Sequence, residues 1–284
     1  IIHMEVSKKN MFIEQLISEN RLLSSLHDRV MSSPHYEKQL YNVLEKYTMD
    51  YMEESSDHSV SEEIYFSFIR SYNKDMKIFA KTGKFPLEID ENRSPPGRYE
   101  YDITLLLSCL FSEHRFRIMQ LLDQKSSMAN CGLFIGCGPG LEIELVKNNF
   151  QKLYAYDLSI NEFLLDKHPS VHFNESYFTG ENDDLRYDSI YMIELLEHLS
   201  EPYILLEKCQ KVLSEKGKIF LTTATNIPQF DHLYNFEASH QDFEKKIQNM
   251  GLSISFMEEI PHQYITLDIG AKNRFYILEK ESRI

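Results

Sequence analysis

The sequence is poor in cysteine and has no long apolar run. Its four cysteines, Cys109, Cys131, Cys137 and Cys209, have spacings that fit no zinc-binding pattern. No apolar stretch approaches the roughly 20 residues that a membrane-spanning helix needs. The N-terminal region also lacks the charged and apolar segments of a signal peptide. We therefore expect a cytoplasmic protein with reduced cysteines and no membrane partner.

Basic residues are also scarce relative to acidic ones. The chain has 30 Lys and Arg against 44 Asp and Glu, which gives a formal net charge of −14. A field of this sign repels phosphate backbones, and no dense run of Lys and Arg offsets it. Nucleic acid is therefore disfavoured as a partner, and a small-molecule or peptide-like substrate is favoured. The sequence leaves the oligomeric state open.

The first part of the chain, residues 4–125, has the apolar spacing of helices. Pro86, Pro95, Pro96 and Gly97 predict a loop over residues 84–98. Ser61 with two following glutamates indicates a helix start. We expect helices over residues 9–31, 36–52, 61–83, 99–111 and 113–123.

The second part, residues 126–284, alternates short apolar runs with helical stretches. Such alternation predicts a mostly parallel sheet with helices on both faces. The last two strand candidates are joined by a short loop, which predicts an antiparallel hairpin at the sheet edge. The strand candidates are 131–136, 152–157, 170–174, 187–193, 217–223, 253–258 and 274–280; the helical stretches are 140–149, 160–166, 202–213 and 240–250.

A glycine-rich turn follows the first of these strands. Residues 133–142 read LFIGCGPGLE, so that Gly136, Cys137, Gly138 and Gly140 form a Gly-x-Gly-x-Gly turn before a helix. Glycines allow positive φ and close approach of a ligand to the backbone. The next strand ends in Asp157, whose carboxylate suits ribose hydroxyls. The pattern indicates a nucleoside-containing cofactor, and its alternative is an ordinary strand-to-helix loop.

The turn differs from a dinucleotide-binding fingerprint. The usual Gly-x-Gly-x-x-Gly pattern requires glycine where this chain has Leu141, and Pro139 lies inside the turn. A ligand without a pyrophosphate therefore fits better, and S-adenosylmethionine is favoured over NAD.

Four segments in order resemble the class I S-adenosylmethionine-dependent methyltransferases. They are IGCGPGLE (135–142), YAYDLS (154–159), YDSIYMIELLEHL (187–199) and GKIFLTTAT (217–225). The resemblance covers about residues 126–284 and not the helical part. It implies a Rossmann-like seven-stranded sheet with a reversed final strand, and a cofactor across the carboxyl ends of the strands.

The resemblance also implies roles for individual residues. Gly136, Gly138 and Gly140 would face the amino-acid portion of S-adenosylmethionine. Asp157 would hold the ribose, and Leu158 would flank the adenine. Ser176 and Tyr177 would lie near the adenine edge, where many relatives have an aspartate in place of Tyr177. Cys137 and Glu194 complete the predicted cofactor site.

Glu194, Glu197 and His198 follow the fourth strand with the spacing Glu-x-x-Glu-His. In a helix these positions share one face, so the three side chains would converge near the transferable methyl group. The loop after the fifth strand adds Asp231 and His232. We predict Glu197, His198 and His232 as catalytic residues, because imidazole titrates near working pH and can accept a proton from the acceptor.

The same residues form a potential metal site. Carboxylate and imidazole ligands suit a divalent cation, for which Glu194, Glu197, His198 and His232 are the candidate ligands. The segment is similar to the metal site of small-RNA 2′-O-methyltransferases and of related quinone-biosynthesis methyltransferases. In most of the wider family it serves without metal.

The predicted function is thus an S-adenosylmethionine-dependent methyltransferase of specialised biosynthesis, acting on oxygen, nitrogen or carbon of a small molecule or peptide-like metabolite. Residues 4–125 would cover the substrate, and Arg115 or Arg117 would bind an acceptor carboxylate; the alternative for these arginines is a solvated helix face. Rival hypotheses are a metal-dependent O-methyltransferase of the RNA-end or catechol type, a non-catalytic binding subunit with this fold, and a nicotinamide-dependent enzyme.

Overall fold

The computed structural model describes residues 13–54, 61–181, 184–262 and 267–281. The chain divides into two compact units, one formed by residues 1–71 and 96–121 and the other by residues 72–95 and 122–284. Residues 9–12 of the first predicted helix lie outside the described residues. Among the residues described, no helix combines the length and apolar character that a membrane span requires.

The first unit is helical, as the sequence predicts, but the helix expected over residues 9–31 is interrupted at Asn20, whose extended backbone and side chain cap the start of α2 (Arg21–Ser32). Helix α6 packs against α2 and α3, and its Asp102 is fully buried. Tyr51 of α3 donates a 2.6 Å hydrogen bond to Asp102, and Arg98 forms an ion pair with the same carboxylate at 2.9 Å. These bonds satisfy a buried charge that would otherwise be costly. Besides helical residues 13–19, the unit contains α2 (Arg21–Ser32), α3 (Lys38–Glu54), the first part of α4 (Ser61–Thr82), α6 (Arg98–Phe111) and most of α7 (Glu113–Lys125).

The second unit is built on a sheet that, among the described residues, has seven strands in the order β3-β2-β1-β4-β5-β7-β6. Strands β1 to β5 are parallel, whereas β7 runs antiparallel to both β5 and β6. The reversed final strand and the predicted hairpin are confirmed. The strands are β1 (Ala129–Ile135), β2 (Phe150–Asp157), β3 (Val171–Glu175), β4 (Tyr187–Met192), β5 (Leu213–Thr225), β6 (Leu252–Pro261) and β7 (Lys272–Lys280).

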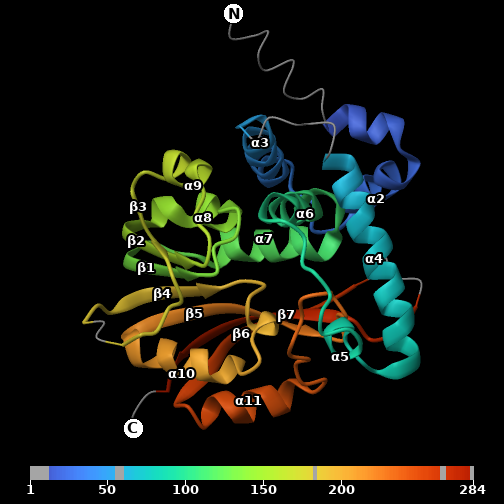
Figure 1. The fold of residues 1–284 in the computed structure, drawn as a ribbon. Helices are drawn as coiled ribbons and strands as arrows, with labels where there is room; N and C mark the ends of the chain where they lie inside the picture. Colours follow the sequence, from blue (N-terminus) through green and yellow to red (C-terminus); the bar gives the residue numbers. More distant parts are fainter. Residues whose placement is uncertain (1–12, 55–60, 182–183, 263–266, 282–284) are drawn as a thin grey trace, which may run out of the picture. The chain divides into compact units, whose positions relative to one another are not determined.

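The two faces of the central strands have different cores. On one face the rings of Phe134, Tyr191 and Phe220 stack in series, with centroids 4.5 and 4.8 Å apart. On the other face, aliphatic and some aromatic side chains pack with those of α10 and α11, which lie below the sheet in Figure 1. The connecting helices are α8 (Leu141–Val146), α9 (Glu162–Lys167), α10 (Pro202–Val212) and α11 (His240–Gln248), with short turns η2 (Lys147–Asn149) and η3 (Leu196–His198).

The unit boundary differs from the one that the sequence suggests. Residues 72–95 group with the sheet and not with the other helices. This segment holds the end of α4 and the short helix α5 (Pro86–Ile89) inside the predicted loop 84–98. Arg93 and Asp75 form an ion pair at 2.8 Å across it, and its Phe85 is buried. The helical pattern of the sequence continues through this segment and therefore does not distinguish it from the other helices. Its unit is decided by packing with residues that are distant in the sequence.

Candidate functional site

The glycine turn lies at the carboxyl end of β1. Gly136, Gly138 and Gly140 have φ values of +71°, +49° and +83°, which side chains rarely adopt. A Cβ atom on Gly136 would lie 2.7 Å from Leu195 Cδ1. The turn therefore needs glycine for its conformation, and at Gly136 it also touches the segment that follows β4. Cys137 is buried within the turn.

Asp157 holds the turn from the end of the neighbouring strand β2. Its Oδ2 accepts a hydrogen bond from Gly138 N at 2.9 Å, and its Oδ1 accepts one from Ser159 N at 3.2 Å. A carboxylate has about four acceptor positions, so one such group can accept from both main-chain amides and ligand hydroxyls. The predicted pairing of glycine turn and acidic residue is therefore present in space.

The predicted adenine-flanking residues follow two adjacent strand ends. Asp157 and Glu175 are paired in register at the ends of β2 and β3. Beyond them Leu158 is 57% exposed and Tyr177 is 71% exposed, and Ser176 is exposed as well. Two large exposed apolar side chains at one sheet edge suit the faces of a nucleobase. Their role in cofactor binding stays a prediction.

The segment after β4 does not form the helix that the sequence predicts. Glu194 has a φ of +50°, and only residues 196–198 form a short turn, η3. The left-handed residue breaks the helical register, so Glu194 does not share a face with Glu197 and His198. Instead, Glu194 Oε1 accepts a 2.9 Å hydrogen bond from Asn273 Nδ2 on β7. Local spacing could not reveal this partner 79 residues away.

The loop after β5 is fastened to this segment by the main chain. The carbonyl of Glu197 accepts hydrogen bonds from Leu233 N at 2.8 Å and from Tyr234 N at 3.0 Å. At the loop base, Asn226 N donates to Asn235 Oδ1 at 2.8 Å. These bonds bring the loop residues Asp231 and His232 beside η3.

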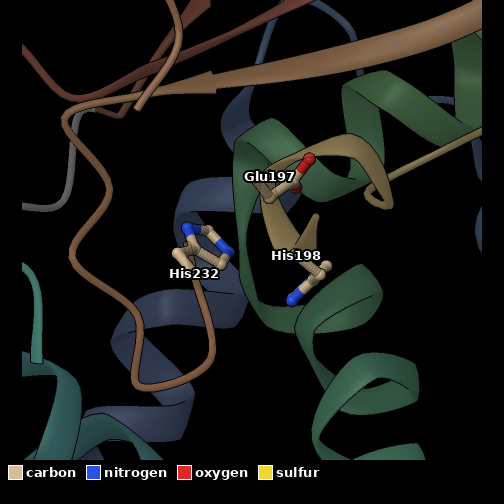
Figure 2. A group of neighbouring side chains, drawn as sticks. All are labelled: Glu197, His198 and His232. Carbon is tan, nitrogen blue, oxygen red and sulfur yellow. The ribbon is translucent and has the colours of Figure 1, made fainter. Parts of the chain in front are cut away.

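Glu197, His198 and His232 form one cluster, shown in Figure 2. One ligand atom of each residue lies within 4.8 Å of the others, and the two imidazole rings meet edge to face at 4.9 Å. His198 Nδ1 pairs with Asp231 Oδ2 at 3.2 Å, and His232 Nδ1 donates to the carbonyl of Ile227 at 2.8 Å. In each ring the contact of Nδ1 fixes the orientation of the imidazole, and Nε2 is the other nitrogen that can bind a ligand or a proton.

The cluster contains a buried carboxylate. Glu197 has no exposed surface, and neither of its carboxylate oxygens has a hydrogen-bond partner among the described residues. Burial raises the pKa of Glu197 to about 8, and the nearby charge of Glu194 adds to this. A native protein rarely leaves such a group unsatisfied, so the site is suited to a proton, a cation or a polar ligand.

The two histidines do not titrate near neutral pH, contrary to the sequence-based expectation. Burial alone would lower the pKa of His198, but the hydrogen bond and charge of Asp231 outweigh it and raise this pKa to about 9. Burial and the charge of His198 lower the pKa of His232 to about 3. At neutral pH His198 is therefore a cation and His232 a neutral imidazole.

The ion pair between His198 and Asp231 predicts a pH-dependent stability. The folded-state pKa of His198, about 9, exceeds its ordinary value of 6.5, so this stabilisation is complete below pH 6.5 and is lost as the pH rises through 9. We expect Asp231→Asn to lower the free energy of unfolding by about 1–3 kcal/mol at pH 6. Urea unfolding of chelator-treated protein should show the difference shrinking towards pH 9.5. A difference that stays constant over this range would contradict the assignment.

One further side chain reaches the cluster from residues 72–95. The ring of Phe85 lies 6.4 Å from that of His232, and Phe79 lies 5.5 Å from Phe85. Phe85 lies in the segment 84–98 that the sequence predicts to be a loop, and no sequence pattern marked it as a site residue. Phe85 thus places a buried aromatic ring beside His232.

The two arginines predicted to bind an acceptor carboxylate have partners inside the helical unit. Arg117 Nη1 donates to Gln120 Oε1 at 2.6 Å. Arg115 is 5% exposed, and its Nη2 lies 3.7 Å from Cys109 Sγ. These contacts support structural roles, and binding of an acceptor by either arginine stays a prediction.

Comparison with known protein families gives one match. The family described as methyltransferase domain matches residues 111–262, which is more than half of the chain. The helices before residue 111 lie outside this match. A search among curated proteins gave no match.

Solved structures with a similar arrangement have low sequence identity. The O-methyltransferase NcsB1 from neocarzinostatin biosynthesis, in complex with S-adenosylmethionine and 2-hydroxy-5-methyl naphthoic acid, has a TM-score of 0.50 and 12% identity over 72% of this chain and 67% of that chain. The N-methyltransferase NodS from Bradyrhizobium japonicum WM9, with S-adenosyl-L-homocysteine, has a TM-score of 0.49 and 14% identity over 77% and 99%. The 1,6-didemethyltoxoflavin-N1-methyltransferase from Burkholderia thailandensis has a TM-score of 0.49 and 14% identity over 67% of this chain and 93% of that chain. The first of these supports the fold of the sheet unit.

Proposed function

The chain belongs to the methyltransferase-domain family, and on this premise we propose that it transfers the methyl group of S-adenosylmethionine to a small-molecule or peptide-like metabolite. The acceptor atom is an oxygen, nitrogen or carbon, and a biosynthetic role fits such a substrate. The observation that carries the proposal is the hydrogen bond between the glycine turn and Asp157, which joins the two elements that a nucleoside cofactor requires.

The residues present fit the donor. The three turn glycines have no Cβ, which allows a ligand to approach the backbone closely, and Asp157 can accept from ribose hydroxyls at the end of β2. Leu158 and Tyr177 offer exposed apolar surface for the adenine. When bound, S-adenosylmethionine supplies an activated methyl group, so the protein mainly aligns the two reactants and excludes water.

The cluster beside η3 suits the acceptor half of the reaction. Because its pKa of about 8 lies near working pH, Glu197 is better matched to accept a proton from the acceptor than either histidine. His232 is neutral and can accept a hydrogen bond from an acceptor hydroxyl or amine through Nε2. The His198 cation, fixed by Asp231, can orient an anionic acceptor group. The net charge of −14 favours acceptors other than nucleic acid.

A methyl-transfer assay tests the proposed substrate class. Methyl-labelled S-adenosylmethionine is incubated with the protein and separate pools of small phenols, hydroxy and amino acids, short peptides and RNA oligonucleotides. We expect label in a small-molecule or peptide pool and none in RNA. Label in RNA alone would overturn the substrate class but leave the donor intact.

A second candidate is a divalent-cation-dependent O-methyltransferase, which the unsatisfied carboxylate of Glu197 favours. Metal-bound histidines usually donate their other ring N–H to a carboxylate or backbone carbonyl, and His198 and His232 are both oriented in this manner by Nδ1. Glu197, His198 and His232 would hold the ion, which would supply charge stabilisation for an acceptor oxygen. Glu194, the fourth ligand that the sequence proposes, accepts a hydrogen bond from Asn273 and is not part of this group of three.

The metal hypothesis makes a direct prediction. Calorimetric titration of chelator-treated protein with Mn²⁺ and with Zn²⁺ should show one ion per chain, and His232→Ala should weaken its binding at least about tenfold, because one of three ligands is lost. His172→Ala, at an exposed histidine on β3, should change nothing. Absence of stoichiometric binding, or binding that survives His232→Ala, would leave only the metal-free reaction.

A further inference from the structure

A chain of hydrogen bonds holds the carboxylate of Glu194 at the end of β4. Asn273 is completely buried, and its Nδ2 donates to Glu194 Oε1 at 2.9 Å and to the carbonyl of Thr223 at 3.4 Å. Its Oδ1 lies 2.6 Å from His262 Nε2. Since an amide oxygen can only accept, His262 donates through Nε2. His262 therefore donates to Asn273, and Asn273 in turn donates to the carboxylate of Glu194.

The backbone of Glu194 is held as firmly as its side chain. Its φ of +50° is unfavourable for a residue with a side chain, and its N–H donates to the buried Thr222 Oγ1 at 2.6 Å. Backbone strain of this kind persists where the surrounding structure imposes it, and it is common at functional sites. The residues that hold Glu194, at the end of β4, thus come from β5, from β7 and from the position just after β6, and these strands are neighbours in the sheet.

Glu194 is also placed next to the glycine turn. Strands β1 and β4 are parallel neighbours, so their carboxyl ends meet at one sheet edge. Leu195, the next residue, is close enough to Gly136 that a Cβ there would lie 2.7 Å from Leu195 Cδ1. The turn that would face the amino-acid portion of the donor is therefore bordered by the segment that carries Glu194.

The network favours an anion and brings no positive charge of its own. Burial lowers the pKa of His262 to about 4, so this imidazole is neutral at working pH. Burying an amide and an imidazole is costly, and the hydrogen bonds from His262 to Asn273 and from Asn273 to Glu194 offset part of this cost. Here both are committed to orienting a carboxylate at the candidate site.

We propose that Asn273 and His262 are positioning residues that hold the Glu194 carboxylate where it binds the cationic methionine portion of the methyl donor. The inference rests on the proposed function, because it requires a bound donor. It assigns a role to the β6–β7 hairpin, which lies outside the glycine turn and the Asp157 strand end.

Two ligands separate this role from a purely structural one. S-adenosylhomocysteine carries the charged amino-acid portion, whereas 5′-methylthioadenosine shares the nucleoside but lacks that portion. In calorimetric titrations we expect Asn273→Leu and His262→Phe to weaken S-adenosylhomocysteine binding about tenfold, the equivalent of one charge-assisted hydrogen bond. Binding of 5′-methylthioadenosine should change less than twofold. His262→Gln, which keeps an N–H donor, should retain most of the affinity.

Circular dichroism identifies the variants that fold. If Asn273→Leu does not fold, His262→Phe carries the test, because His262 is only half-buried and its substitution disturbs the core less. Equal weakening of both ligands would show that the network is only structural and would overturn the inference. Unchanged S-adenosylhomocysteine affinity in both variants would overturn it as well, with the proposed function intact. A wild-type protein that binds neither ligand would instead refute the proposed function itself.

Discussion

Asp157→Ala should weaken S-adenosylhomocysteine binding about 100-fold or more. The substitution removes the acceptor for Gly138 N and Ser159 N, so the glycine turn loses its anchor on β2. It also removes the proposed contacts with two ribose hydroxyls, and each hydrogen bond to a charged group contributes about 1.5–3 kcal/mol. Calorimetric titration measures the dissociation constant. Asp157→Asn, which keeps one acceptor oxygen, should give an intermediate value.

Glu175 provides the matched control for Asp157. It ends the adjacent strand in register with Asp157, and its carboxylate accepts a 2.9 Å hydrogen bond from Ile160 N at the same sheet edge. Glu175→Ala should change the dissociation constant less than about threefold. Equal effects of the two substitutions would mean that Asp157 acts through general charge or stability and not through the ligand.

Glu197→Gln should lower kcat/KM about 100- to 10,000-fold with little change in S-adenosylhomocysteine affinity. Glutamine has nearly the same shape but cannot accept a proton, and loss of a general base has effects of this size. The assay uses the acceptor found in the methyl-transfer screen. Glu201→Gln, at an exposed residue four positions further along the chain, is the control and should retain activity. Similar losses in both variants would remove Glu197 from its proposed role.

The same variant has a consequence that needs no acceptor. The pKa of Glu197 rises from 4.5 to about 8 on folding, so the wild-type protein loses stability as the pH increases towards and through 8. Glutamine cannot ionise, and Glu197→Gln should therefore unfold at higher urea concentration than the wild type at pH 9. An unchanged or lower midpoint at that pH would contradict a buried, unsatisfied carboxylate.

The sheet and the donor half of the site follow from local sequence pattern. Short apolar runs separated by helical stretches predicted the strands to within a few residues, because the central strands β1, β4 and β5 are mostly buried and apolar. The glycine turn and Asp157 are each marked by residue type at the end of a strand. Their meeting in space then follows from parallel pairing of β1 and β2.

The acceptor half depends on contacts that local pattern does not encode. Glu194 does not adopt the helical conformation, because its N–H donates to Thr222 on β5 and its carboxylate accepts from Asn273 on β7. Both residues lie further along the chain, where a local pattern around Glu194 cannot reveal them. The pKa values of His198 and His232 are set by burial and by Asp231, and not by residue type. Phe85 reaches His232 from about 150 residues earlier in the chain.

Calorimetric titration of the wild-type protein with S-adenosylhomocysteine, and separately with NAD⁺, tests the central claim most directly. Donor binding requires no knowledge of the acceptor, and the two ligands share an adenosine but differ in the pyrophosphate that Leu141 and Pro139 disfavour. We predict one S-adenosylhomocysteine per chain and no saturable binding of NAD⁺. Saturable NAD⁺ binding, or no binding of S-adenosylhomocysteine, would contradict the account.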